Sequence, residues 1–264
     1  MAELSFEGRV AVVTGAGNGL GRAYALELAR RGCAVCVNDL GGGMKGEAAD
    51  GETERPADVV VAEITSAGGK AVANYDSVEQ GENIIATAVE AFGRVDILIN
   101  NAGILRDRSF RRMADQDWDL IMTVHVKGVW ACTKAAWELM QQQGFGRIVN
   151  VASPAGLYGN VGQANYSTAK MGMVGLTQTL AKEARGAKKD IKVNCIAPLA
   201  GTRMLESVYP PELVKLLKTE HIVSLVLYLC HEANQETGTV FECSGGVYQK
   251  VQLARAQGYA HGTR

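Results

Sequence analysis

A tyrosine and a lysine four positions apart are the residues in this sequence best suited to chemistry. Tyr166 and Lys170 lie in a segment with a helical pattern, so the spacing places the phenol and the ammonium on one helix face. A neighbouring cation lowers the cost of forming a phenolate, which can exchange a proton with a substrate. Such a pair is also typical of an ordinary solvated helix face. Ser153, 13 residues upstream at the end of a strand-like run, adds a hydroxyl at the edge of the sheet where ligands bind.

A glycine-rich turn follows the first strand-like run of the chain. Residues 14–21 read Thr-Gly-Ala-Gly-Asn-Gly-Leu-Gly and pass directly into a helical pattern. Glycines permit a tight turn and let the N–H groups at the start of a helix approach a pyrophosphate closely. The turn therefore predicts a dinucleotide site. The cofactor-binding residues expected here are Gly15, Asn18, Gly19, Leu20 and Gly21.

An acidic residue ends the second strand-like run. Asp39 lies 18 residues beyond Gly21, and its carboxylate can accept hydrogen bonds from both hydroxyls of an adenosine ribose. The same charge would repel a 2′-phosphate, so the sequence favours NAD over NADP as the cofactor. The alternative is that Asp39 caps the loop that follows it.

These residues must be positioned by alternating strands and helices. Short apolar runs, expected as strands, occupy residues 10–13, 34–37, 71–73, 95–99, 148–151, 191–195 and 240–241. Apolar residues at helical spacing occupy residues 20–30, 59–67, 84–92 and 171–184. This alternation predicts an α/β fold in which helices cover both faces of a doubly wound parallel sheet. We expect one domain over residues 1–264, with a surface loop over 40–56 and an arm or flexible tail from about residue 250.

The composition excludes several classes of protein. The chain has 264 residues, with 27 Lys and Arg against 28 Asp and Glu, so it lacks a general basic field for nucleic acid. No apolar run approaches the roughly 18 residues of a membrane-spanning helix, which predicts a soluble protein without a membrane partner. We recognise no secretory signal, transit peptide or usual peroxisomal tripeptide at the ends of the sequence.

The six cysteines do not form a metal-binding pattern. Cys33 and Cys36 have the spacing of a ligand pair, but they lie in a β-branched run, where residues three apart point to opposite faces. No second pair of this spacing and no histidine pair accompanies them. We therefore expect a buried strand, no metal, and a reducing compartment.

Taken together and in this order, the motifs resemble those of the short-chain dehydrogenase/reductase family over nearly the whole chain. The matching pieces are residues 14–21, Asp76, residues 100–103 (Asn-Asn-Ala-Gly), Ser153, and Tyr166 with Lys170. The resemblance implies a Rossmann-like sheet of about seven strands. It also implies that Tyr166 is the catalytic acid and base, that Ser153 binds the substrate oxygen, and that Lys170 holds the nicotinamide ribose.

The resemblance implies further cofactor contacts. Asp76 would lie near the adenine, and Asn101, with Ala102 and Gly103, would hold the strands beside the cofactor. Thr202 follows the sixth strand-like run, at the place where the family contacts the nicotinamide amide. The alternative for Thr202 is a plain helix-capping role.

One position departs from the family pattern. Where the wider family has an asparagine in the helix after the fourth strand, this sequence has His125, within Val-His-Val-Lys-Gly. An imidazole can hold or pass a proton through water, which makes His125 a candidate catalytic residue that supports Lys170. The alternative is a partly buried helix histidine with a structural role.

Within the family, the likeness is strongest to the (3R)-hydroxyacyl-CoA dehydrogenase regions of peroxisomal multifunctional enzymes of type 2. The similar blocks are residues 37–42, 74–78, 101–110, 158–160, 162–166 and 230–232. This likeness implies NAD-dependent interconversion of (3R)-hydroxyacyl-CoA and 3-ketoacyl-CoA in fatty-acid β-oxidation, in a peroxisomal-type matrix or the cytoplasm. The alternatives are a 3-oxoacyl-carrier-protein reductase, a hydroxysteroid dehydrogenase and, from another class, a non-catalytic regulator that senses NAD.

Two further features concern partners. Arginines at positions 106, 108, 111 and 112 follow the Asn-Ala-Gly turn and could meet the phosphates of CoA. We favour instead a solvated face whose charge is neutralised by Asp107, Asp115 and Asp117. The family usually assembles through the helix that bears Tyr166 and the helix before it, so the resemblance implies a homodimer or homotetramer.

Overall fold

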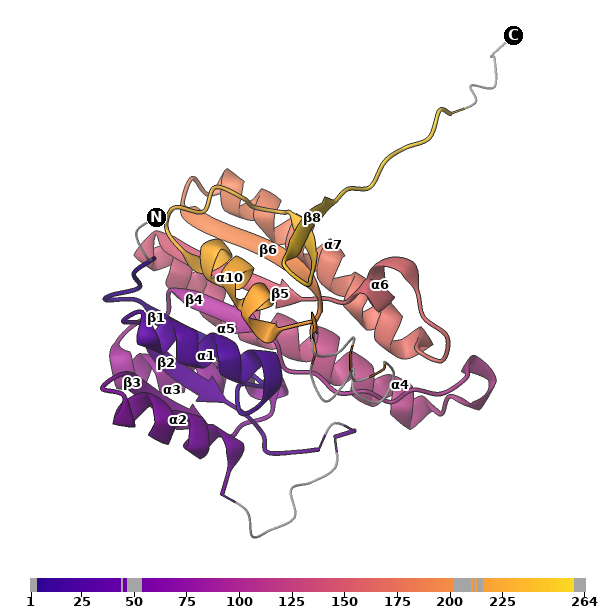
Figure 1. Cartoon of the computed structure of the whole chain (residues 1–264). Helices are drawn as coiled ribbons and strands as arrows, with labels where there is room; N and C mark the ends of the chain where they lie inside the picture. The colour runs from indigo at the N-terminus through magenta and orange to yellow at the C-terminus, as the bar shows by residue number, and fades with distance from the viewer. Residues whose placement is uncertain are drawn as a thin grey trace.

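The structure is a computed structural model that describes residues 4–43, 45–46, 54–201, 210, 212 and 216–258. Within these residues, eight strands form one sheet in the order β3-β2-β1-β4-β5-β6-β7-β8 (Figure 1). The strands are β1 Val10–Thr14, β2 Ala34–Asn38, β3 Lys70–Asn74, β4 Ile97–Asn100, β5 Phe145–Val151, β6 Asp190–Leu199, β7 Val240–Ser244 and β8 Val247–Val251. All neighbours from β3 through β7 pair in parallel, which confirms the predicted doubly wound sheet.

The sheet has one strand more than the seven expected from the sequence. β8 pairs antiparallel with β7, and only Gly245 and Gly246 lie between them. Both glycines have positive φ angles, 52° and 85°, as a tight two-residue hairpin turn requires. Beyond Val251, residues 252–258 are exposed and have no regular structure, and the chain runs away from the sheet (Figure 1).

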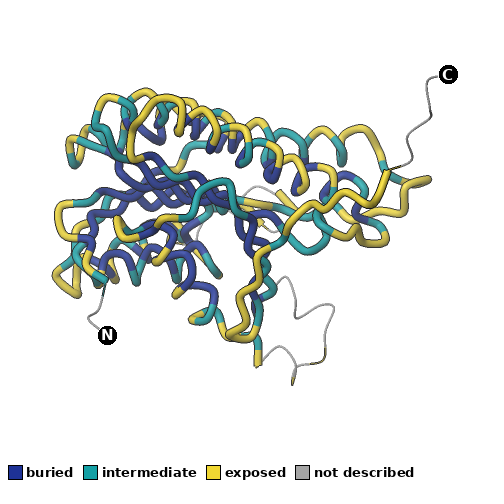
Figure 2. Tube along the Cα trace, turned by 90° about the horizontal axis from the view of Figure 1, so that it is seen from above, coloured by how far each residue is buried: buried dark blue, intermediate teal, exposed yellow. Residues whose placement is uncertain are grey.

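Helices cover both faces of the sheet, and the layers are clear when the molecule is seen from above (Figure 2). The helices are α1 Gly19–Arg30, α2 Pro56–Ser66, α3 Gly81–Phe92, α4 Asp115–Met122, α5 Gly128–Gln143, α6 Pro154–Tyr158, α7 Ala164–Gly186 and α10 Thr219–Cys230. Short turns of other types are η1 Val78–Gln80 and η2 Phe110–Arg112, both 3-10, and η3 Thr123–Lys127, which is π-helical. The helices α1, α2 and α10 pack on one face, and α3, α5 and α7 pack on the other. Among the described helices, none combines the length and apolar character needed to span a bilayer.

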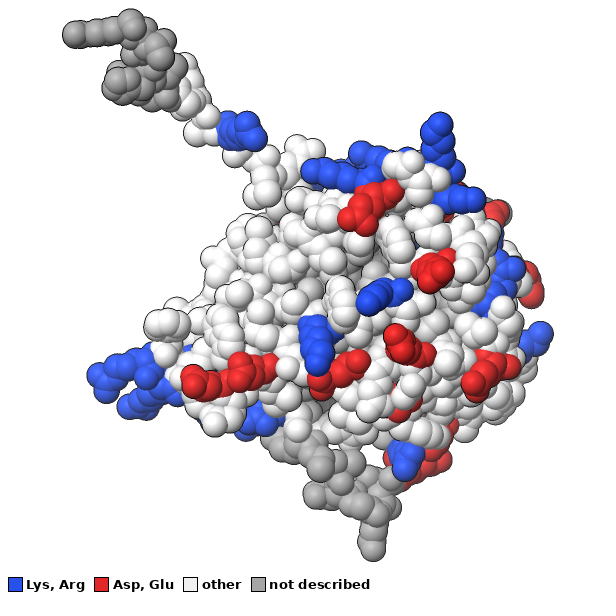
Figure 3. Space-filling model, turned by 180° about the vertical axis from the view of Figure 1, so that it is seen from behind, with Lys and Arg blue, Asp and Glu red and all other residues white. Residues whose placement is uncertain are grey.

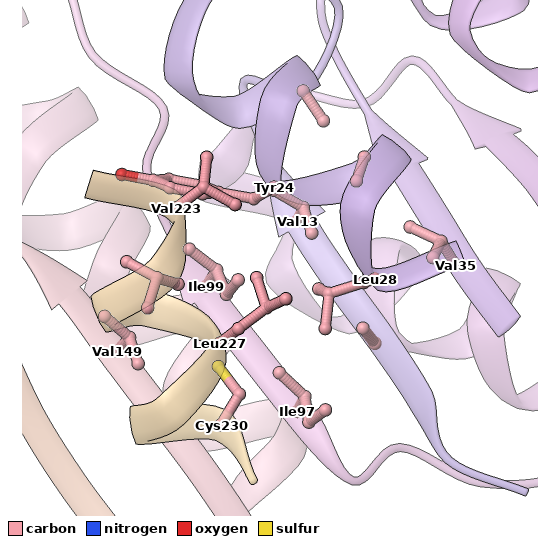
Figure 4. Packing of buried hydrophobic residues seen from close by; sticks show 14 of the residues in the cluster. Val13, Tyr24, Leu28, Val35, Ile97, Ile99, Val149, Val223, Leu227 and Cys230 are labelled. Carbon is pink, nitrogen blue, oxygen red and sulfur yellow. The ribbon is translucent and has the colours of Figure 1, made fainter. Parts of the chain in front are cut away.

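The core on the α1 side fixes the start of α1 relative to the end of β1. Tyr24 and Leu28, four positions apart on α1, form part of the same buried cluster as Leu227 of α10 and Val13 of β1 (Figure 4). Their spacing gives the helix one apolar stripe, which must pack against the sheet. Burying an aliphatic side chain such as Leu28 contributes roughly 1.5–3 kcal/mol. The glycine turn that precedes α1 is therefore held at the carboxyl edge of the sheet.

The cysteines are part of the packing. Cys33 belongs to the cluster on the α1 side of the sheet and Cys36 to the cluster on the α3 side, so the pair points to opposite faces as predicted. All six cysteines are free and buried. Burial raises the pKa of Cys36 and of Cys132 to about 12, so both sulfurs remain thiols at neutral pH.

Candidate active site

The turn between β1 and α1 leaves the first N–H groups of the helix open. Asn18 precedes α1 in an extended conformation, and its side chain makes no capping hydrogen bond. Gly15 and Gly19 have positive φ angles of 62° and 55°, which glycine adopts without strain. A Cβ on Gly21 would lie 2.2 Å from the carbonyl oxygen of Gly15. Bare backbone and the positive end of a helix thus meet here, as the binding of a pyrophosphate requires.

The Asn-Ala-Gly segment after β4 is fastened to this turn. The Asn101 side-chain amide donates to the carbonyl oxygens of Thr14 and Gly15, both at 3.0 Å. The Thr14 hydroxyl oxygen accepts from the N–H groups of Asn101 at 3.0 Å and Ala102 at 3.1 Å. A Cβ on Gly15 would lie 2.7 Å from the Cα of Ala102. Asn101 therefore fixes the turn, and Thr14, which the sequence analysis did not select, is its partner.

Two carboxylates follow the neighbouring strands β2 and β3. The Asp39 carboxylate accepts hydrogen bonds from the N–H groups of Gly17 at 2.8 Å and Gly41 at 2.9 Å. Asp39 therefore caps its own loop and also touches the glycine turn, where a ribose-binding carboxylate would have to lie. The Asp76 carboxylate accepts from the side-chain amide of Asn74 at 2.8 Å. Each carboxylate keeps further lone pairs for a ligand.

Ser153 and Tyr166 interact beyond the carboxyl end of β5. Ser153 caps α6, and its Oγ accepts from the Ala155 N–H at 3.2 Å, which leaves its own O–H able to donate. Tyr166 is in the first turn of α7 and is 7% exposed. Burial raises the pKa of Tyr166 to about 12; the hydrogen bond with Ser153 lowers it, and the charge of Asp107 raises it further. The phenol is therefore protonated at neutral pH.

Lys170 lies one helical turn after Tyr166. Its Nζ is 5.5 Å from the centre of the Tyr166 ring and donates to the carbonyl oxygen of Val151 at 2.6 Å. Burial lowers the pKa of Lys170 to about 8, although the nearby thiol of Cys195 acts in the opposite direction. The amine therefore carries a positive charge at neutral pH, close to the phenol.

His125 lies in the π-helical turn η3, between α4 and α5. Its Nε2 is 3.1 Å from the backbone nitrogen and 2.9 Å from the backbone oxygen of Ile104, and its ring meets the Tyr166 ring edge to face at 5.3 Å. Burial first, and then the charge of Lys170, hold the pKa of His125 well below its usual range, so the ring is neutral. Within the part of the chain that the structure describes, Nδ1 of this ring has no hydrogen-bond partner. His125 is thus a buried helix histidine that also touches the candidate catalytic tyrosine.

Residues that the sequence analysis did not select hold the loop from Ile104 to Ser109 against the start of α7. The Asn165 side-chain amide donates to the carbonyl oxygens of Arg106 and Asp117, both at 3.1 Å. The Gln163 amide donates to the Asp107 carboxylate at 2.8 Å. Asn165 and Gln163 are buried. The only signal for them in the sequence was the presence of two amide side chains just before Tyr166.

A chain of hydrogen-bonded, buried polar side chains connects the strands β4 and β5 to the helices α5 and α7. The Asn100 side-chain amide, at the end of β4, donates to Asn150 of β5 at 2.9 Å and to Thr133 of α5 at 3.0 Å. The Asn150 amide donates to Thr177 of α7 at 2.9 Å. The helix that carries Tyr166 is therefore tied to two central strands by satisfied hydrogen bonds.

Comparison with known proteins decides the family. The profile of the short chain dehydrogenase family matches residues 9–212. The chain is a short-chain dehydrogenase. The family implies a nicotinamide dinucleotide cofactor, and the open helix start, the glycines that leave no room for a Cβ and the adjacent carboxylate of Asp39 fit that cofactor.

Relatives of this short-chain dehydrogenase include longer proteins. It is 58% identical, over 98% of its chain, to the peroxisomal hydratase-dehydrogenase-epimerase of Neurospora crassa, of which it covers 28%. It is 55% identical, over 97% of its chain, to the peroxisomal multifunctional enzyme type 2 of Mus musculus, of which it covers 34%. The solved structure of the full-length peroxisomal multifunctional enzyme type 2 from Drosophila melanogaster is similar with a TM-score of 0.81 and 42% identity, covering 97% of this chain and 42% of that one. The chain thus spans less than half the length of these relatives.

The remaining predicted residues of this short-chain dehydrogenase lie in three places. Leu20 is in the first turn of α1 and packs against the core on that side of the sheet. Gly103 lies against His125, since a Cβ on Gly103 would be 2.6 Å from the imidazole Cε1. Thr202 lies outside the described residues.

Proposed function

We propose that this short-chain dehydrogenase interconverts (3R)-hydroxyacyl-CoA and 3-ketoacyl-CoA with NAD, as a step of fatty-acid β-oxidation. The observation that carries the proposal is that Tyr166, Ser153 and Lys170 interact beyond the carboxyl end of β5, at the same edge of the parallel sheet as the glycine turn that follows β1. The substrate class follows from the likeness to the type 2 multifunctional enzymes, which extends over 97% of the chain. The same likeness supports a peroxisomal-type setting.

The cofactor we propose is NAD, which accepts or gives a hydride at its nicotinamide when bound. The open N–H groups at the start of α1 bind the pyrophosphate, and Asp39 binds the adenosine ribose. Lys170 holds the nicotinamide ribose, and Asp76 lies near the adenine. Thr202 is the proposed partner of the nicotinamide amide.

The proton is handled by the tyrosine and the serine. Tyr166 takes the hydroxyl proton of the substrate in oxidation and returns it in reduction. The Ser153 O–H donates to the substrate oxygen, on which negative charge develops. Because burial raises the pKa of Tyr166 to about 12, the phenol is ready to donate in the reductive direction. The oxidative direction needs positive charge near the phenol, and Lys170 supplies part of it.

The experiment that tests this function is NAD reduction measured with separate (3R)- and (3S)-hydroxyacyl-CoA series of varied chain length. We expect turnover with the (3R) series only, and none with a Tyr166→Phe variant that still binds NADH. Activity confined to carrier-protein thioesters or to hydroxysteroids would replace the substrate class. Tight NAD binding without turnover of any of these substrates would support the regulator instead.

A further inference from the structure

The loop between the Asn-Ala-Gly turn and α4 carries arginines with two different environments. Arg106 lies 3.3 Å from the Asp117 carboxylate and donates through Nε to the Lys45 carbonyl oxygen at 2.6 Å. Arg108 lies 4.0 Å from the same carboxylate. The predicted neutralisation by Asp117 therefore holds for these two arginines.

Arg111 and Arg112 are not neutralised in this way. Both are exposed in the 3-10 turn η2, and within the part of the chain that the structure describes neither side chain has a hydrogen bond or ion pair. Phe110, which begins the turn, is 79% exposed. Seen from behind, Lys and Arg side chains gather at the edge of the molecule formed by this loop (Figure 3). An aromatic ring and two unpaired guanidinium groups thus share one short turn.

The turn is held in place by its neighbours. The Arg108 N–H donates to the Gly162 carbonyl oxygen at 2.9 Å, and the Arg112 N–H donates to the Ser109 carbonyl oxygen at 2.8 Å. The α4 helix begins three residues after the turn, at Asp115. The two guanidinium groups are therefore presented by a fixed backbone, which reduces the entropy lost when they bind a ligand.

This turn is also close to the candidate catalytic tyrosine. Asn165, the residue before Tyr166, donates to the Arg106 carbonyl oxygen at 3.1 Å. From Arg106 to Arg111 the chain advances five residues, which span at most about 18 Å. This reach starts at the residue that Asn165 contacts, and it is comparable to the length of the pantetheine arm of CoA, which a thioester would need to extend from Tyr166 to phosphates at η2.

We propose that Arg111 and Arg112 bind the phosphates of the CoA moiety and that Phe110 packs against its adenine. The proposal rests on the proposed function, because it assumes that the substrate is an acyl-CoA. A guanidinium group binds phosphate through two parallel N–H donors. These donors are available only when no carboxylate is already paired with them. An exposed aromatic ring offers a face on which a nucleobase stacks.

The test compares a full CoA thioester with the N-acetylcysteamine thioester of the same (3R)-hydroxyacyl group, which lacks the nucleotide. In Arg111→Ala/Arg112→Ala, the ratio of kcat/KM for the CoA substrate to that for the truncated substrate falls about threefold to tenfold, since each exposed charge pair contributes modestly. Free CoA weakens as an inhibitor by a similar factor. The control is Lys182→Ala/Lys189→Ala, which also removes two positive charges. Lys182 is near the end of α7 and Lys189 is three residues beyond it, and we expect this variant to leave the ratio unchanged.

The outcomes distinguish the failure of CoA binding at η2 from the failure of the proposed dehydrogenase function. Equal losses on both thioesters, or no change in the ratio, would overturn CoA binding at η2 while the dehydrogenase activity stands. A loss confined to a carrier-protein thioester would also overturn it and would assign the turn to an acidic protein partner. If the wild-type enzyme turns over neither thioester, the proposed function itself fails.

Discussion

Tyr166 and Lys170 occupy a site whose burial favours the neutral form of both groups. Burial raises the pKa of Tyr166 to about 12 and lowers that of Lys170 to about 8. The free side chains have nearly equal pKa values, whereas here the amine loses its proton well before the phenol does. The phenol therefore holds its proton at neutral pH, and a phenolate forms only when positive charge lies close to it.

The depressed pKa of Lys170 predicts how stability depends on pH. The unfolded lysine keeps its proton up to about 10.5, whereas the folded one releases it near 8, so the unfolded state binds more protons in this window. The stability of the wild type relative to Lys170→Met should therefore rise with pH across the window, by at most about 1.4 kcal/mol per pH unit. Urea unfolding of both proteins at several pH values measures the difference. A constant or falling difference would contradict the depressed pKa.

His125 should affect the rate through Tyr166 and the Ile104 backbone, both of which its ring contacts. We expect His125→Ala to lower kcat about tenfold to a hundredfold and to change the pH–rate profile, because positioning of the tyrosine is lost. His125→Asn, which restores the residue typical of the family, should recover part of the rate. Measured pH–rate profiles decide the matter, and an unchanged rate and profile in His125→Ala would leave only a packing role.

Asp39 should set the choice between NAD and NADP. In Asp39→Ser the charge that repels a 2′-phosphate is gone, while the hydroxyl can still accept from the Gly17 N–H. We expect the ratio of kcat/KM for NADP to that for NAD to rise at least about tenfold, since the removed repulsion amounts to a kcal/mol or more. Steady-state kinetics with both cofactors measure this ratio. If it stays unchanged, Asp39 serves only to cap its loop.

At the scale of residues, the sequence predicted which groups meet but not their surroundings. The spacing of Tyr166 and Lys170 and the position of Ser153 were enough to bring these side chains together. The direction of the Tyr166 pKa was not predictable, because it depends on burial by segments distant in the chain. Likewise, the sequence could not show that Asp117 pairs with Arg106 and Arg108 and leaves Arg111 and Arg112 exposed.

At the scale of elements, the glycine turn and α1 form one close-packed unit. A Cβ on Gly21 would lie 2.2 Å from the Gly15 oxygen and 2.5 Å from the Asn101 amide nitrogen. Gly21→Ala should therefore cost about 1–3 kcal/mol and weaken NADH binding. Gly186→Ala, at the end of α7 with no atom within 4 Å of the added Cβ, should instead stabilise the protein by about 0.5–1 kcal/mol. Denaturant unfolding and NADH titration of both variants test the contrast, and equal effects would contradict it.

The elements themselves were predictable to different degrees. The parallel strands and the helices α1, α2 and α3 followed from apolar periodicity, and their ends differ by at most four residues. The helix α7 begins at Ala164, seven residues before the predicted start, and α4, α5 and α10 had no predicted range. The eighth strand was missed although Gly245-Gly246 is a recognised hairpin signal. The π-helical turn η3 has no such signal, because an extra residue in a helical turn is decided by tertiary packing around His125.

At the scale of the whole molecule, one face is suited to self-assembly. A groove between α4, η3, α5 and α7 is lined mainly by apolar side chains, with Asp119, Thr123 and Lys127 among them, and Trp130 in its lining is 49% exposed. Seen from behind, the side of the molecule that carries α3, α5 and α7 includes a broad area with few charged side chains (Figure 3). The homodimer or homotetramer that the resemblance implies stays a prediction, and we propose this face for its contact because an exposed apolar area is typical of an interface.

A charge on this face should therefore prevent assembly. We expect Trp130→Glu to convert a homodimer or homotetramer into a monomer, because the glutamate would be buried without a partner. Light scattering coupled to size-exclusion chromatography measures the mass. The control is Tyr228→Glu, which adds the same charge at an exposed aromatic residue on α10, across the sheet. Equal masses for Trp130→Glu and the wild type would rule out this face.

Because every cysteine is buried, the reactivity of the cysteines shows when the folded structure opens. All six sulfurs are covered by the folded chain, and burial raises the pKa of several of them to about 12. An alkylating reagent reacts with the thiolate, so the intact fold protects each sulfur twice, by access and by ionisation. The rate of alkylation under native conditions therefore depends on how often each layer opens. Cys33, just before β2, and Cys36, within β2, report on opposite faces of the sheet.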